Sequence, residues 1–282
     1  MAARTPDDLA ITPRDISFGR HGPRRRWWLA DDPVATAVFD ALSVTFPHGE
    51  RFFIDSVRAF RSQMPDPLKA QIDAFVAQEF MHTREHRFFN NQTASHGIDV
   101  RALEERTRAV LDVARTRPPL QQLGVTIALE HFTAILAHAI LTDPRHLDGA
   151  TEEARAMWRW HAIEEIEHKA VAFDTFLKAS SHLPAWRRWL LRTSTMLLAT
   201  GVLIGTITRN IADLFARDGL TGPRPWARLI AYLFVRPGLL RQVAGAYLSY
   251  FRPGFHPWIH DDRPLIDAVE QTLVLRESPS LS

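Results

Sequence analysis

Apolar and polar residues along most of the chain follow helical rather than strand spacing. After an irregular opening with Pro6, Pro13, Gly19, Gly22 and Pro23, long segments carry apolar residues three or four positions apart. This period is typical of amphipathic α-helices, whereas a half-buried strand alternates at every second residue between turn signals. No convincing run of the second kind occurs. The pattern therefore predicts an all-α protein.

Prolines, glycines and capping residues divide the pattern into successive helices. Asp32 and Pro33 suit the cap and first position of a helix, and Pro47 then either kinks that helix or starts a new one reaching about Arg61. Residues 90–97 are expected to form a polar loop. Further helices are expected at about 67–90, 99–115, 119–141 and 151–179, and after Pro184 with breaks at 219–225, 237–238 and 253–257.

The division into three parts follows from these breaks and from the distribution of charge. Residues 1–32 are expected to be an irregular N-terminal segment, and residues 33–180 a helical bundle. The formal net charge is only +2, but residues 181–260 hold 10 arginines and 2 aspartates. Residues 181–282 are therefore expected to form a basic, apolar helical portion packed on the bundle.

One uncharged segment raises the question of membrane contact. Residues 193–208 carry no charge, and at 1.5 Å per residue they extend roughly 24 Å, short of a hydrocarbon core of about 30 Å. We expect a buried helix here. Flanking Trp186, Trp189 and nearby arginines keep a helix on a membrane surface as the alternative, ahead of a true span.

Composition limits the chemistry and the compartment. The apolar share of 46% and charged share of 23% are those of an ordinary soluble globular protein. The absence of cysteine excludes disulfides, zinc–thiolate sites, iron–sulfur clusters and thiol nucleophiles, so any metal must be held by histidine and carboxylate. Residues 1–15 lack the apolar core of a secretory signal, which predicts a cytoplasmic protein.

Two Glu-x-x-His pairs are the main candidates for chemistry. They are Glu79 with His82, and Glu165 with His168. At i and i+3 on a helix, the carboxylate and the imidazole project from one face and can bind the same metal ion. Both pairs lie on apolar stripes that should face a core. Unpaired charges there would lower the free energy of unfolding by roughly several kcal/mol. A metal cation would compensate for them.

Two further glutamates complete a recognisable set. Glu50 lies among phenylalanines, and Glu130 lies in an otherwise apolar helix. The chain order becomes Glu50, Glu79-x-x-His82, Glu130, Glu165-x-x-His168. One glutamate from each of two helices plus one Glu-x-x-His from each of two others is the pattern of a four-helix bundle that holds two metals.

The ligand pattern resembles that of the ferritin-like di-iron carboxylate superfamily over roughly residues 33–180. Within it, His161-x-x-x-Glu165-x-x-His168 resembles the p-aminobenzoate N-oxygenase type, in which a third histidine precedes the last glutamate by four residues. The run from Trp160 to Lys169 is also similar to a bacterial family described as predicted metal-dependent hydrolase, and this similarity extends from Ile11 towards the C-terminus.

The resemblance implies a role for each ligand. Glu79 and Glu165 would bridge the metals, Glu50 and His82 would complete one site, and Glu130 with His168 the other. His161 would add a ligand to the second metal. The implied fold is a ferritin-like bundle with additional C-terminal helices, and the implied cofactor is two iron ions. Manganese and zinc also suit ligands of this type.

Several neighbouring residues are weighed against these ligands. His86 shares the face of His82, but an outer or helix-end role is favoured over metal binding. His131 is expected to pack or face solvent, and an outer role is left open for His138. Glu164 is the alternative to Glu165, while Glu153 and Glu167 are expected to be solvated. The basic run at residues 24–28 is expected to be a solvated loop edge.

The preferred function is a di-iron oxidase or oxygenase that activates O₂ and oxidises a mostly apolar organic substrate with the help of an electron donor. The alternative is a dinuclear hydrolase that uses a metal-bound hydroxide. Metal storage without an organic substrate is the third option. No nucleic-acid motif is present. Peripheral membrane contact and a homodimer are both kept open as partners.

Overall fold

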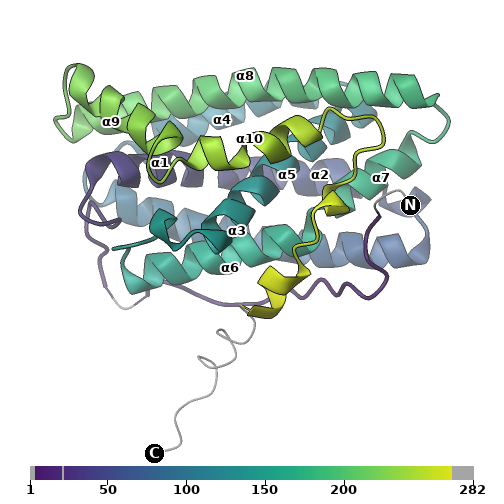
Figure 1. Cartoon of the computed structure of the whole chain (residues 1–282), viewed down its shortest axis with the longest axis horizontal. Coiled ribbons are helices and arrows are strands. Elements are labelled where there is room, and N and C mark those ends of the chain that lie inside the picture. The colour runs from purple at the N-terminus through teal and green to yellow at the C-terminus, as the bar shows by residue number, and fades with distance from the viewer. Residues whose placement is uncertain (1–3, 21, 269–282) are drawn as a thin grey trace, which may run out of the picture.

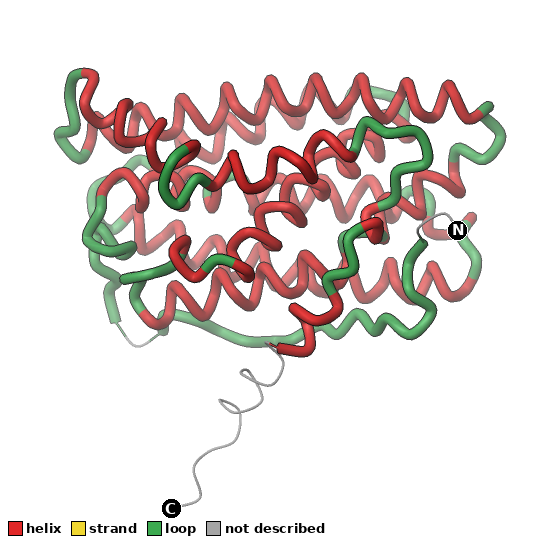
Figure 2. Tube along the Cα trace, viewed as in Figure 1, coloured by secondary structure: helices red, strands yellow, loops and turns green. Residues whose placement is uncertain are grey.

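The computed structural model describes residues 4–20 and 22–268, and this part of the chain is all-helical (Figure 1), as predicted. Figure 2 shows the helices joined by loops, with no strand among the described residues. The helices are α1 (Pro33–Ser43), α2 (Phe46–Arg58), α3 (Asp66–Ala94), α4 (Val100–Arg115), α5 (Pro119–Thr142), α6 (Glu152–His168), α7 (Val171–Ala179), α8 (Ala185–Arg217), α9 (Pro223–Phe234) and α10 (Leu239–Ser249).

Two helix pairs form the centre of the molecule. Helix α2 packs along α3, and α5 packs along α6. Helix α5 also contacts α7, α8 and α10, so it is covered on several sides. In Figure 1, α8 runs along the upper edge of the molecule, whereas α3 and α6 lie in its lower half. The candidate ligands are therefore enclosed between packed helices.

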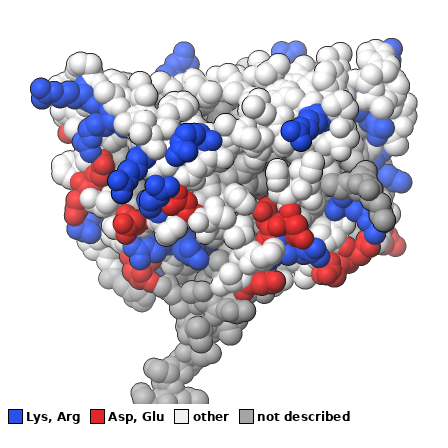
Figure 3. All heavy atoms as spheres, in the orientation of Figure 1, with Lys and Arg blue, Asp and Glu red and all other residues white. Residues whose placement is uncertain are grey.

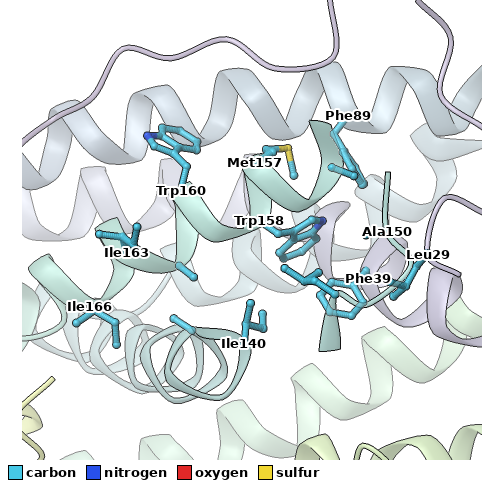
Figure 4. Packing of buried hydrophobic residues seen from close by; sticks show 14 of the residues in the cluster. Leu29, Phe39, Phe89, Ile140, Ala150, Met157, Trp158, Trp160, Ile163 and Ile166 are labelled. Carbon is cyan, nitrogen blue, oxygen red and sulfur yellow. The ribbon is translucent and has the colours of Figure 1, made fainter. Parts of the chain in front are cut away.

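An aromatic cluster joins the first helix and the opening segment to this centre. Trp158 of α6 packs edge-on against Phe39 of α1 at 4.9 Å between ring centroids and against Phe89 of α3 at 6.1 Å. Trp28 packs against both phenylalanines. Figure 4 shows Trp158, Phe39 and Phe89 turned towards one another. Large buried rings of this kind contribute strongly to the free energy of folding.

The prediction of a solvated loop edge at residues 24–28 is wrong for alternate residues. Trp28 is fully buried and donates its indole N–H to Asp40 over 3.0 Å. The guanidinium of Arg24 lies 3.4 Å from the centroid of the Phe89 ring, and Arg26 pairs with Asp40 at 2.7 Å. A buried acid and an aromatic face on the neighbouring helices hold these cations, which local composition does not reveal.

Helix α3 extends into the expected loop at 90–97. It ends only at Ala94, because Asn90 and Thr93 are buried and bonded rather than solvated. The Asn90 side-chain oxygen accepts from Ser43 over 2.6 Å, and the Thr93 hydroxyl accepts from Arg24 over 2.6 Å. The polar residues at the end of α3 therefore form buried hydrogen bonds to α1 and to the N-terminal segment, instead of a solvated loop.

The single helix expected at 151–179 is two helices. Helix α6 ends at His168 and α7 begins at Val171, with no glycine or proline between them. The break coincides with contacts of Lys169, whose ammonium lies 2.5 Å from Asp262 and 3.9 Å from the centroid of the Trp258 ring. These partners come from the C-terminal segment, so the local pattern could not predict the break.

Helix α8 is not the buried helix that the uncharged segment predicts. By length and apolar composition α8 and α5 could each cross a membrane, but the most apolar stretch of α8 is only 28% buried, whereas that of α5 is 67% buried. Leu197 is 62% exposed and Leu198 is 67% exposed. Helix α8 therefore contributes one side to the core and leaves an apolar side uncovered.

Candidate metal centre

Four helices bring the predicted ligands into one buried cluster. Each has at most 3% of its surface exposed. The ligands are Glu50 on α2, Glu79 and His82 on α3, Glu130 on α5, and His161, Glu165 and His168 on α6. The i and i+3 spacing points each Glu-x-x-His pair into the space between the helices.

One half of the cluster surrounds His168. Its Nε2 atom lies 3.3 Å from Glu79 Oε1, 3.4 Å from Glu130 Oε2 and 3.4 Å from Glu165 Oε2. Potential ligand atoms of Glu79, Glu165 and His168 all lie within 4.8 Å of one another. This half therefore offers one imidazole nitrogen and several carboxylate oxygens to a cation.

The other half surrounds His82. Its Nδ1 atom lies 3.5 Å from Glu165 Oε1 and 3.8 Å from Glu79 Oε2. Ligand atoms of Glu50, Glu79 and His82 form a second group within 4.8 Å. Glu79 and Glu165 thus face both halves, which suits the bridging role that the resemblance implies.

His161 joins the half opposite to the expected one. We expected it beside Glu130 and His168, but its ring stacks on His82 at 4.2 Å between centroids. Its Nε2 atom lies 2.8 Å from Glu165 Oε1, and its ligand atoms group with His82 and Glu165 and with Glu50 and His86. The i−4 spacing correctly placed His161 next to Glu165 but did not fix which side of that carboxylate it approaches.

The hydrogen bonding of the cluster is incomplete without a cation. Buried polar side chains normally have hydrogen-bond partners. Here both oxygens of Glu79 and of Glu130, together with Nδ1 of His82 and Nε2 of His168, have none. One oxygen each of Glu50 and Glu165 is also unpartnered. These atoms converge, and their oxygen and nitrogen donors fit iron, manganese or zinc.

Burial and mutual repulsion set the protonation of the metal-free cluster. Burial, reinforced by neighbouring carboxylates, raises the pKa of Glu50 and Glu79 well above the usual value. Burial is also the largest influence on Glu130, and it raises the pKa of this carboxyl to about 8. These groups therefore carry protons at neutral pH that a cation would displace.

The histidines divide into neutral and charged rings. Burial, together with nearby imidazoles, lowers the pKa of His82 and of His86 well below 6.5, so both rings are neutral at pH 7 and free to donate a lone pair. Burial also opposes charge on His168, but Glu165 and Glu130 outweigh it and raise the pKa of that ring to about 9. The protonated His168 in turn contributes to holding the pKa of Glu165 low despite burial.

Comparison with known proteins agrees with this donor set. The profile of one family, described as predicted metal-dependent hydrolase, matches residues 12–261. The chain belongs to that family. No curated protein and no solved structure matches the chain significantly. The buried cluster and the family together indicate a metal-dependent enzyme.

Two outer polar side chains, Glu164 and Gln78, orient the candidate histidines His82 and His168. Glu164 Oε2 lies 3.0 Å from His82 Nε2, so Glu164 supports His82 and does not replace Glu165. Gln78 Oε1 lies 3.0 Å from His168 Nδ1, and its amide nitrogen donates to Glu167 over 2.7 Å. Partners of this kind fix the ring and tautomer of a metal-binding histidine.

Arg14, near the N-terminal end of the described chain, supplies the positive charge that compensates for Glu164 and Glu167. Arg14 lies 2.5 Å from Glu167 and 3.4 Å from Glu164, and its backbone N–H also donates to Glu164. The expectation that Glu167 is solvated is therefore wrong, since it is 1% exposed. Residues 12–14 cover that side of α6 and keep solvent from it.

Sequence patterns missed a hydrogen-bonded chain behind His161. His86 Nε2 lies 2.6 Å from His161 Nδ1, and the other ring nitrogen of His86 lies 2.8 Å from the Ser43 hydroxyl. Ser43 in turn donates to Asn90. The face that His86 shares with His82 was the only signal of this contact in the sequence, and the structure also groups His86 with Glu50 and His161 as possible ligands.

Two further histidines considered from the sequence, His131 and His138, lie away from the cluster. His131 packs against Tyr250 and Phe255 and reaches the Ala246 carbonyl, as expected for a packing residue. The His138 side chain is 49% exposed and bonds Asp262. The option of an outer role for His138 at the metal centre is therefore ruled out.

Proposed function

We propose that the protein is a dinuclear metal-dependent enzyme built on a ferritin-like bundle. The observation that supports it most is the convergence of unpartnered buried atoms from Glu79, Glu130, His82 and His168. A charge-poor interior keeps such groups only when something compensates for their burial. The pairing of α2 with α3 and of α5 with α6 supports the bundle.

Hydrolysis is the first candidate reaction, and the family description favours it. A bound cation pair supplies Lewis-acid polarisation and, from water, a nucleophile at neutral pH. The chain would contribute neutral His82, a proton-holding Glu130, and the carboxylates Glu79 and Glu165, which face both halves of the cluster and would hold the cations. The chain from His86 to Ser43 keeps His161 in a single orientation.

Oxidation of an apolar substrate with O₂ is the second candidate, and the surroundings of the cluster favour it. Phe75 packs against the His168 ring at 4.8 Å, Phe46 lies 4.6 Å from the His161 ring, and Trp160 lies 4.9 Å from the His82 ring, all between centroids. Such rings exclude water from the centre. Carboxylate-rich sites with some histidine suit iron. This reaction also requires an electron donor.

Hydrolysis and oxidation can be distinguished by the metal that is loaded, zinc or Fe(II), and by the presence or absence of O₂. Hydrolysis predicts that protein loaded with zinc under nitrogen cleaves medium-chain p-nitrophenyl esters. Oxidation predicts that zinc-loaded protein is inert, whereas protein loaded with Fe(II) under nitrogen gains a transient visible absorbance when O₂ is admitted. The Glu165→Ala variant is the control in both assays, because it removes a carboxylate that faces both halves. The absence of both signals would contradict the proposal.

A further inference from the structure

An apolar cavity lies beside the candidate metal centre. Its volume is about 390 Å³, and α2, α4, α5 and α8 line it. Its walls are almost wholly apolar, with Phe46, Leu136, Leu198 and Val202 among the lining residues. Cavities of this size and composition are typical of sites for small organic ligands.

The inner end of this cavity adjoins a smaller one that borders the candidate centre. Phe46, Thr133 and Leu136 also line a smaller apolar cavity of about 30 Å³. His161 and Glu165 form part of the wall of that smaller cavity. Shared walls make the two spaces neighbours, so a chain in the larger cavity ends close to the carboxylate that faces both halves of the cluster.

The outer end of the cavity opens between α4 and α8. Val113 is 59% exposed, Leu198 is 67% exposed and Val202 is 40% exposed, so apolar side chains surround the mouth. Among the described lining residues Arg117 is the one charged side chain, and no described residue pairs with its guanidinium. Arg117 precedes α5, and from its first residue, Pro119, to Thr133 this helix rises roughly 21 Å.

We propose that this cavity binds the aliphatic chain of an anionic amphiphile, with the anionic head at Arg117 and the chain directed towards Glu165. The length, the apolar walls and the single unpaired cation together select that ligand. A compact polar substrate would leave the walls unfilled, and a cationic amphiphile would meet Arg117. The assignment names the substrate class of the metal centre and in that respect rests on the proposed function.

Equilibrium dialysis of metal-free protein against radiolabelled dodecanoate and dodecanol tests this assignment without turnover. Wild-type protein is expected to bind both ligands. Ala199→Trp and Leu129→Trp fill the cavity and are expected to lose at least tenfold in affinity for both. Leu190→Trp, on the exposed side of α8 outside the cavity, is the matched control and is expected to bind normally.

The charge is tested by one more pair of variants. Arg117→Gln is expected to lose about tenfold in affinity for dodecanoate and none for dodecanol, whereas Arg209→Gln changes neither. No binding by wild-type protein, or normal binding by both cavity-filling variants, would overturn the proposal. Equal loss for both ligands in Arg117→Gln would overturn the anionic head. Metal titration of the same samples shows separately whether the centre itself exists.

A second observation concerns the uncovered side of α8. Leu190, Leu197, Leu198, Val202 and Ile204 form what we name the outer face of α8, and each is at least 40% exposed. Trp186 and Trp189 lie near the N-terminal end of α8, and Arg209 and Arg217 lie near its C-terminal end. Large exposed apolar patches on soluble proteins mark contact surfaces.

The charge around this outer face is one-sided. Residues 181–260 hold 10 arginines and 2 aspartates. Both aspartates are paired, Asp213 with Arg106 and Asp218 with Arg26. In the view of Figure 3 the acidic side chains gather in the lower half, while the band over α8 shows arginine and uncharged residues. An apolar strip with tryptophan and arginine at its ends complements an anionic lipid surface.

We propose that the outer face of α8 docks on an anionic bilayer. Such docking places the mouth at Leu198 and Val202 against lipid, from which an aliphatic chain can pass into the cavity. The other occupant that an apolar face could have is a second copy of the chain. The observation that favours lipid is the excess of arginine, because an interface between copies would bring these like charges together.

Flotation with vesicles tests the docking proposal. Full-length protein is expected to float with vesicles of 70% phosphatidylcholine and 30% phosphatidylglycerol at low salt, and less at 0.5 M NaCl. The double variant Leu197→Glu, Leu198→Glu is expected to stay unbound. Phe80→Glu introduces a charge at a 65% exposed apolar residue on α3 and is expected to float like the wild type.

Two results would overturn the docking proposal. The first is the absence of flotation by wild-type protein, or flotation of the double variant at the wild-type level. The second is a dimer in sedimentation analysis that the double variant converts to a monomer, without flotation of either protein. That second result would assign the outer face of α8 to a contact between copies of this chain.

Discussion

The Nε2 atom of His82 lies 3.0 Å from Oε2 of Glu164. The other nitrogen of the same ring faces Glu79 and Glu165 and has no hydrogen-bond partner. Glu164 therefore fixes which nitrogen of His82 is presented to the cluster. The adjacent residues Glu164 and Glu165 point to opposite sides of this imidazole and serve different purposes.

Replacing Glu164 by Gln should weaken metal binding without removing a ligand. The amide keeps the size of the side chain but lacks the charge that supports His82, and losses of this kind cost about 10- to 100-fold in metal affinity. Competition with a chromophoric chelator measures the change. Glu153→Gln, near the start of the same helix, is the control. Equal affinities of Glu164→Gln and wild type would show that Glu164 does not orient His82.

Replacing Arg14 by Met should destabilise the protein. Arg14 is 13% exposed and faces Glu164 and Glu167, which are nearly fully buried. Removing one partner of a buried ion pair leaves the other charge uncompensated, so we expect a loss of about 3 kcal/mol in the free energy of unfolding. Urea titration measures it.

The matched control for Arg14 is Arg25→Met. Arg25 pairs with Asp31, and both side chains are more than 60% exposed. A surface pair of this kind contributes less than about 1 kcal/mol. A loss in Arg14→Met as small as that in Arg25→Met would mean that the opening segment does not stabilise α6.

The stabilisation that metal confers should grow as the pH rises from 6 to 8. Folding raises the pKa of Glu50 and Glu79, and that of Glu130 to about 8. The metal-free folded state therefore binds more protons than the unfolded state in this range, and its stability falls with rising pH. His168 acts in the same direction, since its pKa is raised to about 9.

Metal-loaded protein has already released these protons, so its stability should not fall in the same way. The difference in melting temperature between the loaded and metal-free forms measures the effect across this pH range. Calorimetry in buffers of different ionisation enthalpy should also detect proton release on metal binding. A constant temperature difference and no proton release would mean that the metal-free carboxyls are already ionised.

The spacing of residues in the sequence predicted the all-α fold class and the convergence of the candidate ligands. Both depend on the periodicity of residues within single helices. Glu79 with His82 and Glu165 with His168 each share a helix face wherever the helix lies. The pairing of the helices then followed from the need to bury those faces. The side of Glu165 that His161 approaches depends on how α6 is rotated against α3, which no spacing within α6 encodes.

The errors arose where distant segments supply the partners. Asn90, Glu167 and Arg24 look solvated in sequence. In the fold, Asn90 accepts a hydrogen bond from Ser43, and Glu167 pairs with Arg14. The guanidinium of Arg24 lies over the ring of Phe89. The break after His168 coincides with Lys169 contacts to a segment more than 90 residues away. For α8 the error is the reverse, because apolar residues that look buried in sequence are exposed in the fold. An apolar sequence does not specify whether protein or lipid covers it.

The number of metal ions per chain tests the central claim most directly. Elemental analysis of natively purified protein, with metal titration of the metal-free form, is expected to give two ions per chain. Glu165→Ala and His82→Ala are expected to lose stoichiometric binding, because both residues belong to the buried ligand groups. A wild-type protein that binds no metal, or two ions retained with unchanged affinity in both variants, would contradict the account.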